Sequence, residues 1–159
     1  MPLSKKTVRD VDVRGKRIFV RCDFNVPLEN GRITDDRRIV ESLPTLQYLL
    51  GQDASLVLAS HLGRPKGPSP ELSLAPVADR LGTLLGFEVP LLGDCVGPEV
   101  ETAARALQGG GALMLENLRF HPEEESNDRD FAVALAGLAE LFVNDAFGTA
   151  HRAHASTVG

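Results

Sequence analysis

Residues 16–22 read KRIFVRC and predict the first strand of a buried parallel sheet. Gly15 precedes the stretch, and the polar residues Asp23 and Asn25 follow it closely. A short apolar run bounded in this way is typical of a strand that is covered on both faces. Residues 55–60, SLVLAS, repeat the pattern after a segment with helical spacing. Two such strands separated by a helix indicate parallel strands joined by a crossover.

Helical segments alternate with short apolar runs along the rest of the chain. Residues 36–50 predict a helix, in which Pro44 predicts a kink or a break near Leu43. A second helix is expected to be capped by Ser73 and to carry Pro76 in its first turn. The other predicted elements are helices over residues 98–107 and 128–139, strands over 89–92, 112–116 and 141–143, loops over 61–72 and 122–127, and a helical start at 151.

This order predicts an α/β fold with three layers, in which helices cover both faces of a parallel sheet. The crossovers are expected to be right-handed. The 159 residues suit one domain, residues 1–159, with a hydrophobic core. The chain ends at Gly159 within a segment that would normally lead to another strand. We therefore expect the domain to be incomplete at its C-terminal end.

The overall charge restricts the kind of partner. Apolar residues make up 43% of the chain and the formal net charge is −5, which argues against nucleic acid or an anionic membrane as the main partner. An anion site must then be built locally from basic residues. The two cysteines form no disulfide framework, and the N-terminus has no apolar leader segment. A cytoplasmic location is therefore predicted.

Basic and polar residues follow the predicted strands at their carboxyl ends, where open parallel sheets bind ligands. Arginine is suited to such a site because its planar guanidinium makes paired hydrogen bonds to carboxylate and phosphate. Several arginines at successive strand ends of an acidic protein therefore predict a site for a small, doubly anionic ligand. The residues concerned are Asp23, Asn25, Arg38, His61, Gly63, Arg64, Asn117, Arg119, His121, Asn144, Asp145, His151, Arg152 and His154.

Two other kinds of site can be weighed from the same residues. Asp23-x-Asn25 is similar to the Asp-x-Asp motif of haloacid dehalogenase-type phosphatases, but Asn25 cannot donate a proton as the general acid. Hydrogen bonding to a substrate hydroxyl fits this pair better. His151 and His154 have the spacing of metal ligands, but no third ligand accompanies them at a suitable distance in the sequence. No metal site is therefore predicted.

Five segments, which together span nearly the whole chain, carry a specific signal: RCDFNVPL at 21–28, ITDDRRIVESLPTL at 33–46, SHLGRPKG at 60–67, LENLRFHPEEE at 115–125 and VNDAFGTAHRAHASTVG at 143–159. In sequence and in order, these segments resemble the phosphoglycerate kinase family. The resemblance implies a Rossmann-like N-terminal domain that binds 3-phosphoglycerate or 1,3-bisphosphoglycerate. It also implies a C-terminal domain, absent from this chain, that binds ADP or ATP with Mg²⁺.

The same resemblance implies roles for individual residues. Asp23 and Asn25 match residues that contact the hydroxyl and carboxyl end of the substrate, and Arg38 matches the arginine that stabilises the transferred phosphoryl group. Arg37 stands where threonine is common in the family. The other substrate-binding residues that it implies are Phe24, His61, Leu62, Gly63, Arg64, Arg119 and Arg152.

The implied reaction transfers a phosphoryl group between 1,3-bisphosphoglycerate and ADP in glycolysis. The acceptor in the reverse direction is an ionised carboxylate, so positioning and charge neutralisation are needed rather than a general base. We expect this chain to supply the phosphoglycerate-binding half, to be inactive alone and to be monomeric, as is usual in the family. Two alternatives remain open: a fragment that binds the anion without catalysis, and a phosphatase that releases phosphate without any nucleotide.

Overall fold

The computed structural model describes residues 13–63, 72–120 and 129–145. Within them, a four-stranded sheet has the order β5-β4-β1-β6, and all neighbouring strands pair in parallel. The predicted α/β class is therefore confirmed. The strands are β1 (Arg17–Cys22), β4 (Ser55–Ala59), β5 (Ala112–Met114) and β6 (Leu141–Asp145), and the helices are α1 (Arg37–Gly51), α2 (Ala75–Leu85), α3 (Pro98–Ala106) and α5 (Arg129–Ala136).

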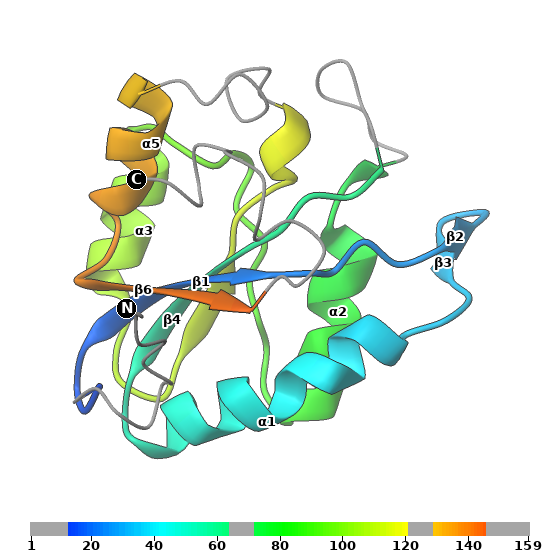
Figure 1. The fold of residues 1–159 in the computed structure, drawn as a ribbon, viewed down its shortest axis with the longest axis horizontal. Coiled ribbons are helices and arrows are strands. Elements are labelled where there is room, and N and C mark those ends of the chain that lie inside the picture. Colours follow the sequence, from blue (N-terminus) through cyan, green and yellow to red (C-terminus); the bar gives the residue numbers. More distant parts are fainter. Residues whose placement is uncertain (1–12, 64–71, 121–128, 146–159) are drawn as a thin grey trace, which may run out of the picture.

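Helices cover both faces of this sheet, which gives the three predicted layers (Figure 1). Alternate side chains of a strand point to opposite faces. Accordingly Ile18 and Val20 of β1 pack in a cluster with α1 and α2, whereas Phe19 packs in a second cluster with α3 and α5. The register pairs Val20 with Leu58 of β4. The polar residues after each strand are thereby brought to one edge of the sheet.

A small hairpin was not predicted. It consists of β2 (Leu28–Glu29) and β3 (Arg32–Ile33), which pair antiparallel. Asn30 and Gly31 form the turn, with φ values of 54° and 76°. Positive φ at both positions is the requirement of a type I′ turn, which Asn-Gly satisfies. The Asn-Gly pair was therefore the available sequence signal.

The predicted strand at residues 89–92 is not a regular strand. The structure gives only one isolated bridge there, between Leu91 and Met114. Two backbone hydrogen bonds nevertheless join this segment to β5, from Leu92 N to Met114 O at 2.9 Å and from Met114 N to Pro90 O at 2.8 Å. Proline has no N–H to donate, so Pro90 prevents a longer ladder.

The helix over residues 36–50 is not broken at Pro44. Helix α1 continues from Arg37 to Gly51 with Pro44 inside it. Pro44 is exposed, and so is Val40, whose carbonyl would otherwise accept a hydrogen bond from position 44. Water can satisfy that carbonyl on the exposed side of the helix, while the buried residues Leu46 and Leu49 hold the second half of α1 on the sheet. Tertiary packing therefore outweighs the local effect of the proline.

Replacing Pro44 by alanine should stabilise the protein. The substitution restores the hydrogen bond to Val40 O, and an interior helical proline costs about 3 kcal/mol. Alanine also gives the unfolded chain back about 1 kcal/mol of conformational entropy. We expect the free energy of unfolding in urea to rise by about 2 kcal/mol. Gln47→Ala, at another exposed position of α1, should change it by less than about 0.5 kcal/mol; equal effects of the two substitutions would contradict this interpretation.

Some expectations lie outside the described residues. They concern the helical start at residue 151, the loop over residues 122–127 and most of the loop over residues 61–72. Among the described residues, no helix is both long enough and apolar enough to span a membrane.

Candidate functional site

The residues that follow β1 and β4 are hydrogen-bonded to each other at the carboxyl edge of the sheet. The Phe24 amide donates to Ser60 Oγ at 2.9 Å, and that hydroxyl donates to the carbonyl of His61 at 2.9 Å. The Gly63 amide donates to Asn25 Oδ1, also at 2.9 Å. Two loops that lie far apart in the sequence therefore form one connected surface. The predicted convergence of these strand ends is seen in the structure.

Arg38 joins this surface from the first turn of α1. Its Nη1 donates to Asp23 Oδ2 at 2.7 Å, and Asp23 Oδ1 accepts a bond from the Asn25 amide at 3.3 Å. About half of the Arg38 side chain is exposed (51%), against 20% for Asp23. Asp23 thus orients a guanidinium that a ligand from solvent can still reach.

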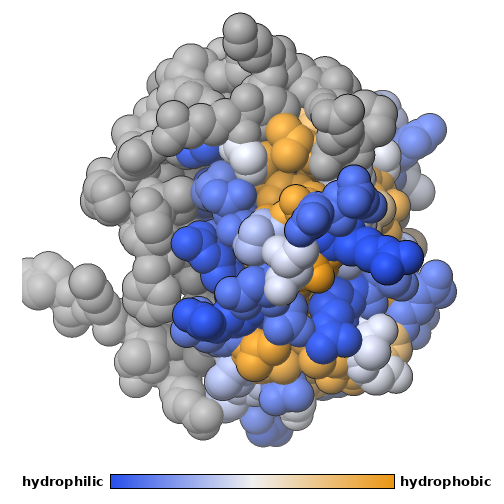
Figure 2. All heavy atoms as spheres, turned by 90° about the vertical axis from the view of Figure 1, so that its right-hand side faces the viewer, coloured by the Kyte–Doolittle hydropathy of each residue, from blue (hydrophilic) through white to orange (hydrophobic). Residues whose placement is uncertain are grey.

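A hollow of about 430 Å³ lies beside Arg38 on the hairpin side of the molecule. It is lined by Asn25, Pro27, Asp35, Arg37, Arg38 and Glu41. Figure 2 shows the side that carries the hairpin, where hydrophilic side chains surround smaller hydrophobic areas. The exposed guanidinium of Arg38 thus lies against an open, polar part of the surface.

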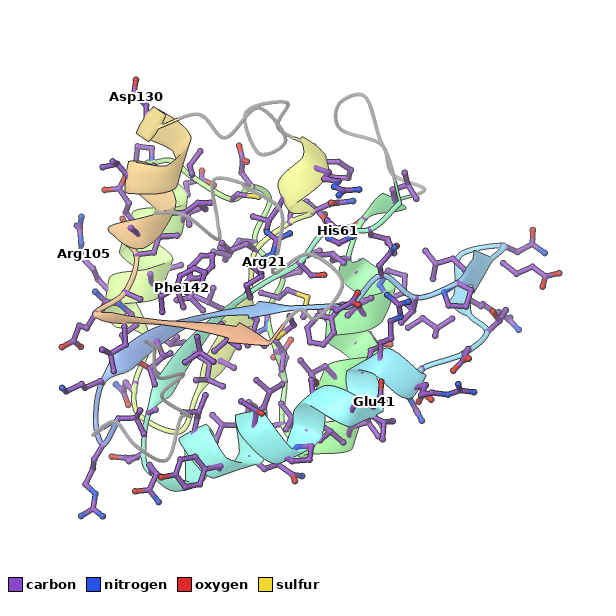
Figure 3. The ribbon with its side chains drawn as sticks, viewed as in Figure 1. Arg21, Glu41, His61, Arg105, Asp130 and Phe142 are labelled. Atoms are coloured by element: carbon purple, nitrogen blue, oxygen red, sulfur yellow. The ribbon has the colours of Figure 1, made fainter. Side chains whose placement is uncertain are left out.

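His61 is buried at the end of β4, where its ring meets Arg21. The distance from Arg21 Nη2 to His61 Nδ1 is 3.4 Å, and the two residues are 0% and 5% exposed (Figure 3). Arg21 occupies the carboxyl end of β1, so the strand itself brings its charge to this edge. Arg21 is not among the predicted site residues. The sequence did contain one sign of its role, which is a basic residue at the end of an otherwise apolar strand.

Arg119 approaches from the 3₁₀ helix Leu118–Phe120, which follows β5. Its Nη1 lies 3.4 Å from the carbonyl oxygen of Gly63, and the residue is only 8% exposed. The buried side chain of Asn117 bonds to the backbone of both Leu62 and Arg119. Arg119 is therefore held against the same loop that carries His61 and Gly63.

Glu116 connects this edge to the start of α2. Its carboxylate accepts hydrogen bonds from Ser73 Oγ at 2.6 Å, the Leu74 amide at 2.8 Å and the Asn117 amide at 2.9 Å. Ser73 Oγ in turn accepts a bond from the Ala75 amide. The prediction that Ser73 caps this helix is wrong by one position, because Leu74 is the N-cap and makes no side-chain cap bond, while Ser73 precedes it. A negative charge at a helix N-terminus is favourable because of the helix dipole.

Of the other predicted site residues, some are buried beneath the site and some lie outside the described residues. Phe24 and Leu62 have buried side chains in the core, and both of their amides are already bonded, to Ser60 and to Asn117. They support the loops, and their predicted contact with a ligand stays a prediction. Arg64, Arg152, His121, His151 and His154 lie outside the described residues, and so do their expected roles.

The described residues also bear on the alternative sites. Among residues 13–63, 72–120 and 129–145, no group of three or more histidine, cysteine, aspartate or glutamate side chains is arranged to hold a metal ion. Asp23 is engaged with Arg38 at 2.7 Å, and Asn25 occupies the position of the second acidic residue. The pair therefore differs from the two-aspartate arrangement that a phosphatase of the haloacid dehalogenase type needs.

The parallel sheet and the bonded loops at its carboxyl edge define an α/β domain of the class that binds ligands at that edge. A family model described as phosphoglycerate kinase matches residues 8–159. The chain therefore belongs to the phosphoglycerate kinase family. This finding removes the main support for the phosphatase alternative, which rested on a resemblance of two residues.

Individual relatives agree with this assignment. The chain is 60% identical over 158 residues to a phosphoglycerate kinase of Pelotomaculum thermopropionicum and 57% identical over 161 residues to the chloroplastic phosphoglycerate kinase 2 of Arabidopsis thaliana, with 99% of this chain covered in each case. Solved phosphoglycerate kinase structures from Coxiella burnetii and Pyrococcus horikoshii OT3 match with TM-scores of 0.85 and 0.87 at 42% and 33% identity, covering 94% and 96% of this chain.

The chain spans only part of these proteins. It covers 40% of the length of the Pelotomaculum thermopropionicum protein and 34% of that of the Arabidopsis thaliana protein. It covers 37% and 39% of the two solved chains. The activity of the whole proteins is therefore carried over only as a proposal.

Proposed function

We propose that this chain is the phosphoglycerate-binding part of a phosphoglycerate kinase, which transfers a phosphoryl group between 1,3-bisphosphoglycerate and ADP. The observation that supports this most directly is the set of bonds at the carboxyl edge of the sheet, which joins Arg38 to Asp23, Asn25 to Gly63 and Gly63 to Arg119. Membership of the family supplies the substrate class. A cytoplasmic location and a monomeric state remain predictions that accompany the proposal.

The two ends of the ligand would meet different parts of this edge. Arg119 and His61, with the predicted ligands Arg64 and Arg152, would hold the phosphate that is not transferred. Asp23 and Asn25 would hydrogen-bond the hydroxyl and the carboxyl end. Arg38 would face the phosphoryl group in transfer, since it is exposed and stands at the open side of the loops.

The contribution of these residues to the reaction is electrostatic and geometric. A carboxylate acceptor needs no general base, so binding in line and neutralising the phosphoryl charge are the main requirements. When bound, ADP would accept the phosphoryl group on its terminal phosphate, ATP would give it up in the reverse direction, and the Mg²⁺ would neutralise part of the charge. The described residues offer no acidic cluster that fits this metal.

Calorimetric titration of the 159-residue chain with 3-phosphoglycerate and with ATP, separately, tests the proposal. We expect a measurable, weak binding of 3-phosphoglycerate and no binding of ATP. Sulfate at the same ionic strength serves as the control for non-specific anion binding. Binding of ATP but not of 3-phosphoglycerate would contradict the proposal.

A chimera tests the catalytic part. The chimera is the Pelotomaculum thermopropionicum relative, which is 60% identical over 158 residues, with its matching segment replaced by the present chain. We expect the chimera to form ATP from 1,3-bisphosphoglycerate and ADP in a coupled assay, and the 159-residue chain alone to be inactive. A folded but inactive chimera would argue for a domain that binds the anion without catalysis, and turnover by the chain alone would contradict its role as one half of the site.

Arg119→Ala should weaken the binding of 3-phosphoglycerate strongly. A charge-assisted hydrogen bond in a buried setting contributes about 1.5–3 kcal/mol, which corresponds to a loss of roughly 10- to 150-fold in affinity. Arg105→Ala is the matched control, because Arg105 is 70% exposed and pairs with Glu101 on the surface of α3. It should leave the affinity unchanged. If both variants bind like the parent chain, Arg119 is not a ligand of the phosphate.

A further inference from the structure

The side chain of Asn117 is fully buried and bonds to three separate backbone segments. We propose that Asn117 is a positioning residue of the anion site, which fixes the loop of His61 and Gly63 relative to Arg119. The ligand concerned is the one assigned under the proposed function, on which this inference rests. Asn117 itself is 0% exposed, so it would act through its neighbours and not by touching the ligand.

One oxygen atom sets the distance between the two parts of the site. Asn117 Oδ1 accepts hydrogen bonds from the Leu62 amide at 3.1 Å and from the Arg119 amide at 3.0 Å. Leu62 lies between His61 and Gly63 in the loop that follows β4. Because the Arg119 amide holds Asn117 Oδ1 at the start of the 3₁₀ helix, a shift of the loop away from this helix would lengthen the bond from the Leu62 amide.

The amide nitrogen of Asn117 holds the loop from its other side. Asn117 Nδ2 donates to the Leu62 carbonyl at 2.7 Å and to the Leu72 carbonyl at 2.9 Å. Leu62 is thus bonded through both its N–H and its C=O to one side chain, as a residue in a sheet ladder is bonded to its neighbour. Leu62 and Leu72 stand ten positions apart in the sequence and are joined through this one nitrogen.

The chemistry of the four bonds requires an amide. An asparagine side chain offers two donor hydrogens and two acceptor lone pairs, and all four are used here. A flipped amide would place its NH₂ group against two N–H groups and its oxygen against two carbonyls. Aspartate has the same shape, but it would place a second oxygen against the carbonyls of Leu62 and Leu72. Buried groups of this kind interact strongly because the local dielectric constant is low.

The side chain of Arg119 is coupled to the same loop. Arg119 Nη1 lies 3.4 Å from the Gly63 carbonyl, next to the residue that Asn117 clamps. The Gly63 amide in turn bonds to Asn25 Oδ1. A displaced loop would therefore disturb Arg119 and Asn25 together, and both are predicted ligands. Small displacements of binding groups have large effects on the binding of a compact, highly charged ligand.

A partly buried side chain that also joins separate segments provides the control. Arg17, at the opposite end of β1, donates from Nε to the Leu138 carbonyl at 2.7 Å and from Nη1 to the Ala104 carbonyl at 3.3 Å. Like Asn117, it joins separate segments through backbone carbonyls, but it lies at the end of the strand that is remote from the site. Arg17→Met should therefore lower stability without affecting the binding of the ligand.

The test compares Asn117→Asp with Arg17→Met in the 159-residue chain. Both are measured by calorimetry with 3-phosphoglycerate, at a temperature where circular dichroism shows them folded, and by urea denaturation. We expect Asn117→Asp to lower the affinity by about tenfold or more, and Arg17→Met to lower the denaturation midpoint with the affinity kept within about twofold.

A double-mutant cycle gives a readout that a purely structural role would not change. If Asn117 acts by positioning Arg119, then Arg119→Ala should cost much less in the Asn117→Asp chain than in the parent chain, about threefold or less. Additive losses would overturn the proposal, and so would parent-like affinity in a folded Asn117→Asp chain.

Asn117→Ser, which keeps one donor and one acceptor, is a second variant for the same test. If both Asn117 variants unfold, the proposal is overturned, because Asn117 then supports the fold alone. Failure of the parent chain to bind 3-phosphoglycerate would instead contradict the proposed function, on which this proposal depends.

Discussion

Replacing Arg38 by alanine in the chimera should lower turnover by about a hundredfold or more, which is the usual cost of removing one group that stabilises developing charge. KM for 1,3-bisphosphoglycerate should change much less, because the proposed contact of Arg38 strengthens in the transition state. The geometry explains why this residue is suited to the role. Asp23 orients the guanidinium through a 2.7 Å contact, while half of the side chain remains exposed.

The neighbouring arginine provides an unusually close control. Arg37 is 78% exposed, and its Nη2 lies 3.8 Å from Asp35 Oδ2, which is a weak surface ion pair. Arg37→Ala removes the same charge one residue away on the same helix, so it should change turnover by less than about twofold. Arg38→Lys keeps the charge but loses the planar fork and should recover only part of the rate. Unchanged turnover in Arg38→Ala, or equal losses in the two alanine variants, would refute the catalytic role of Arg38.

The sequence predicted the layers of the fold well because each strand is a short apolar run and each helix has its own apolar stripe. It could not predict how far these elements extend. Proline is unfavourable inside a helix, yet α1 continues past Pro44 because Leu46 and Leu49 pack on the sheet beyond it. Pro90 lies in an apolar run that resembles a strand, but its missing N–H limits the pairing with β5 to a single bridge. The first outcome depends on contacts between segments, which a single stretch of sequence does not contain, whereas the second follows from a property of proline that the sequence already shows.

In the candidate site too, only some of the residues could be predicted from the sequence. The residues expected to meet the ligand follow strands, so their edge of the sheet could be predicted from the order of elements alone. The residues that hold them are harder to find. Arg21 and Glu116 lie within predicted strands, and neither is among the predicted site residues. Asn117 was predicted as a residue that follows a strand, but its bonds to the backbone of Leu62 and Leu72 leave no spacing pattern in the sequence, so only the folded structure shows what it does.

Leu58→Ala should cost about 2–5 kcal/mol of the free energy of unfolding, the range for leucine truncations in well-packed cores. Leu58 is 0% exposed in β4, and its backbone pairs with Val20 of β1 and Met114 of β5. Its side chain packs in the cluster that joins α1 and α2 to the sheet. A strand held on both sides by neighbours cannot move to close the cavity, so we expect the upper half of the range. Urea denaturation of the 159-residue chain provides the measurement.

Val133→Ala is the control for this loss, since Val133 is 61% exposed on α5 and should change the free energy of unfolding by less than about 0.5 kcal/mol. Leu58→Met, which nearly conserves volume, should cost less than about 1.5 kcal/mol. Leu58 lies two residues before Ser60, whose hydroxyl bonds to the Phe24 amide at the site. If the loops are held by their own hydrogen bonds, folded Leu58→Ala should bind 3-phosphoglycerate with parent affinity despite its lower stability. A parallel loss of affinity would show instead that the position of the loops depends on core packing as much as on the bonds of Ser60, Asn25 and Asn117.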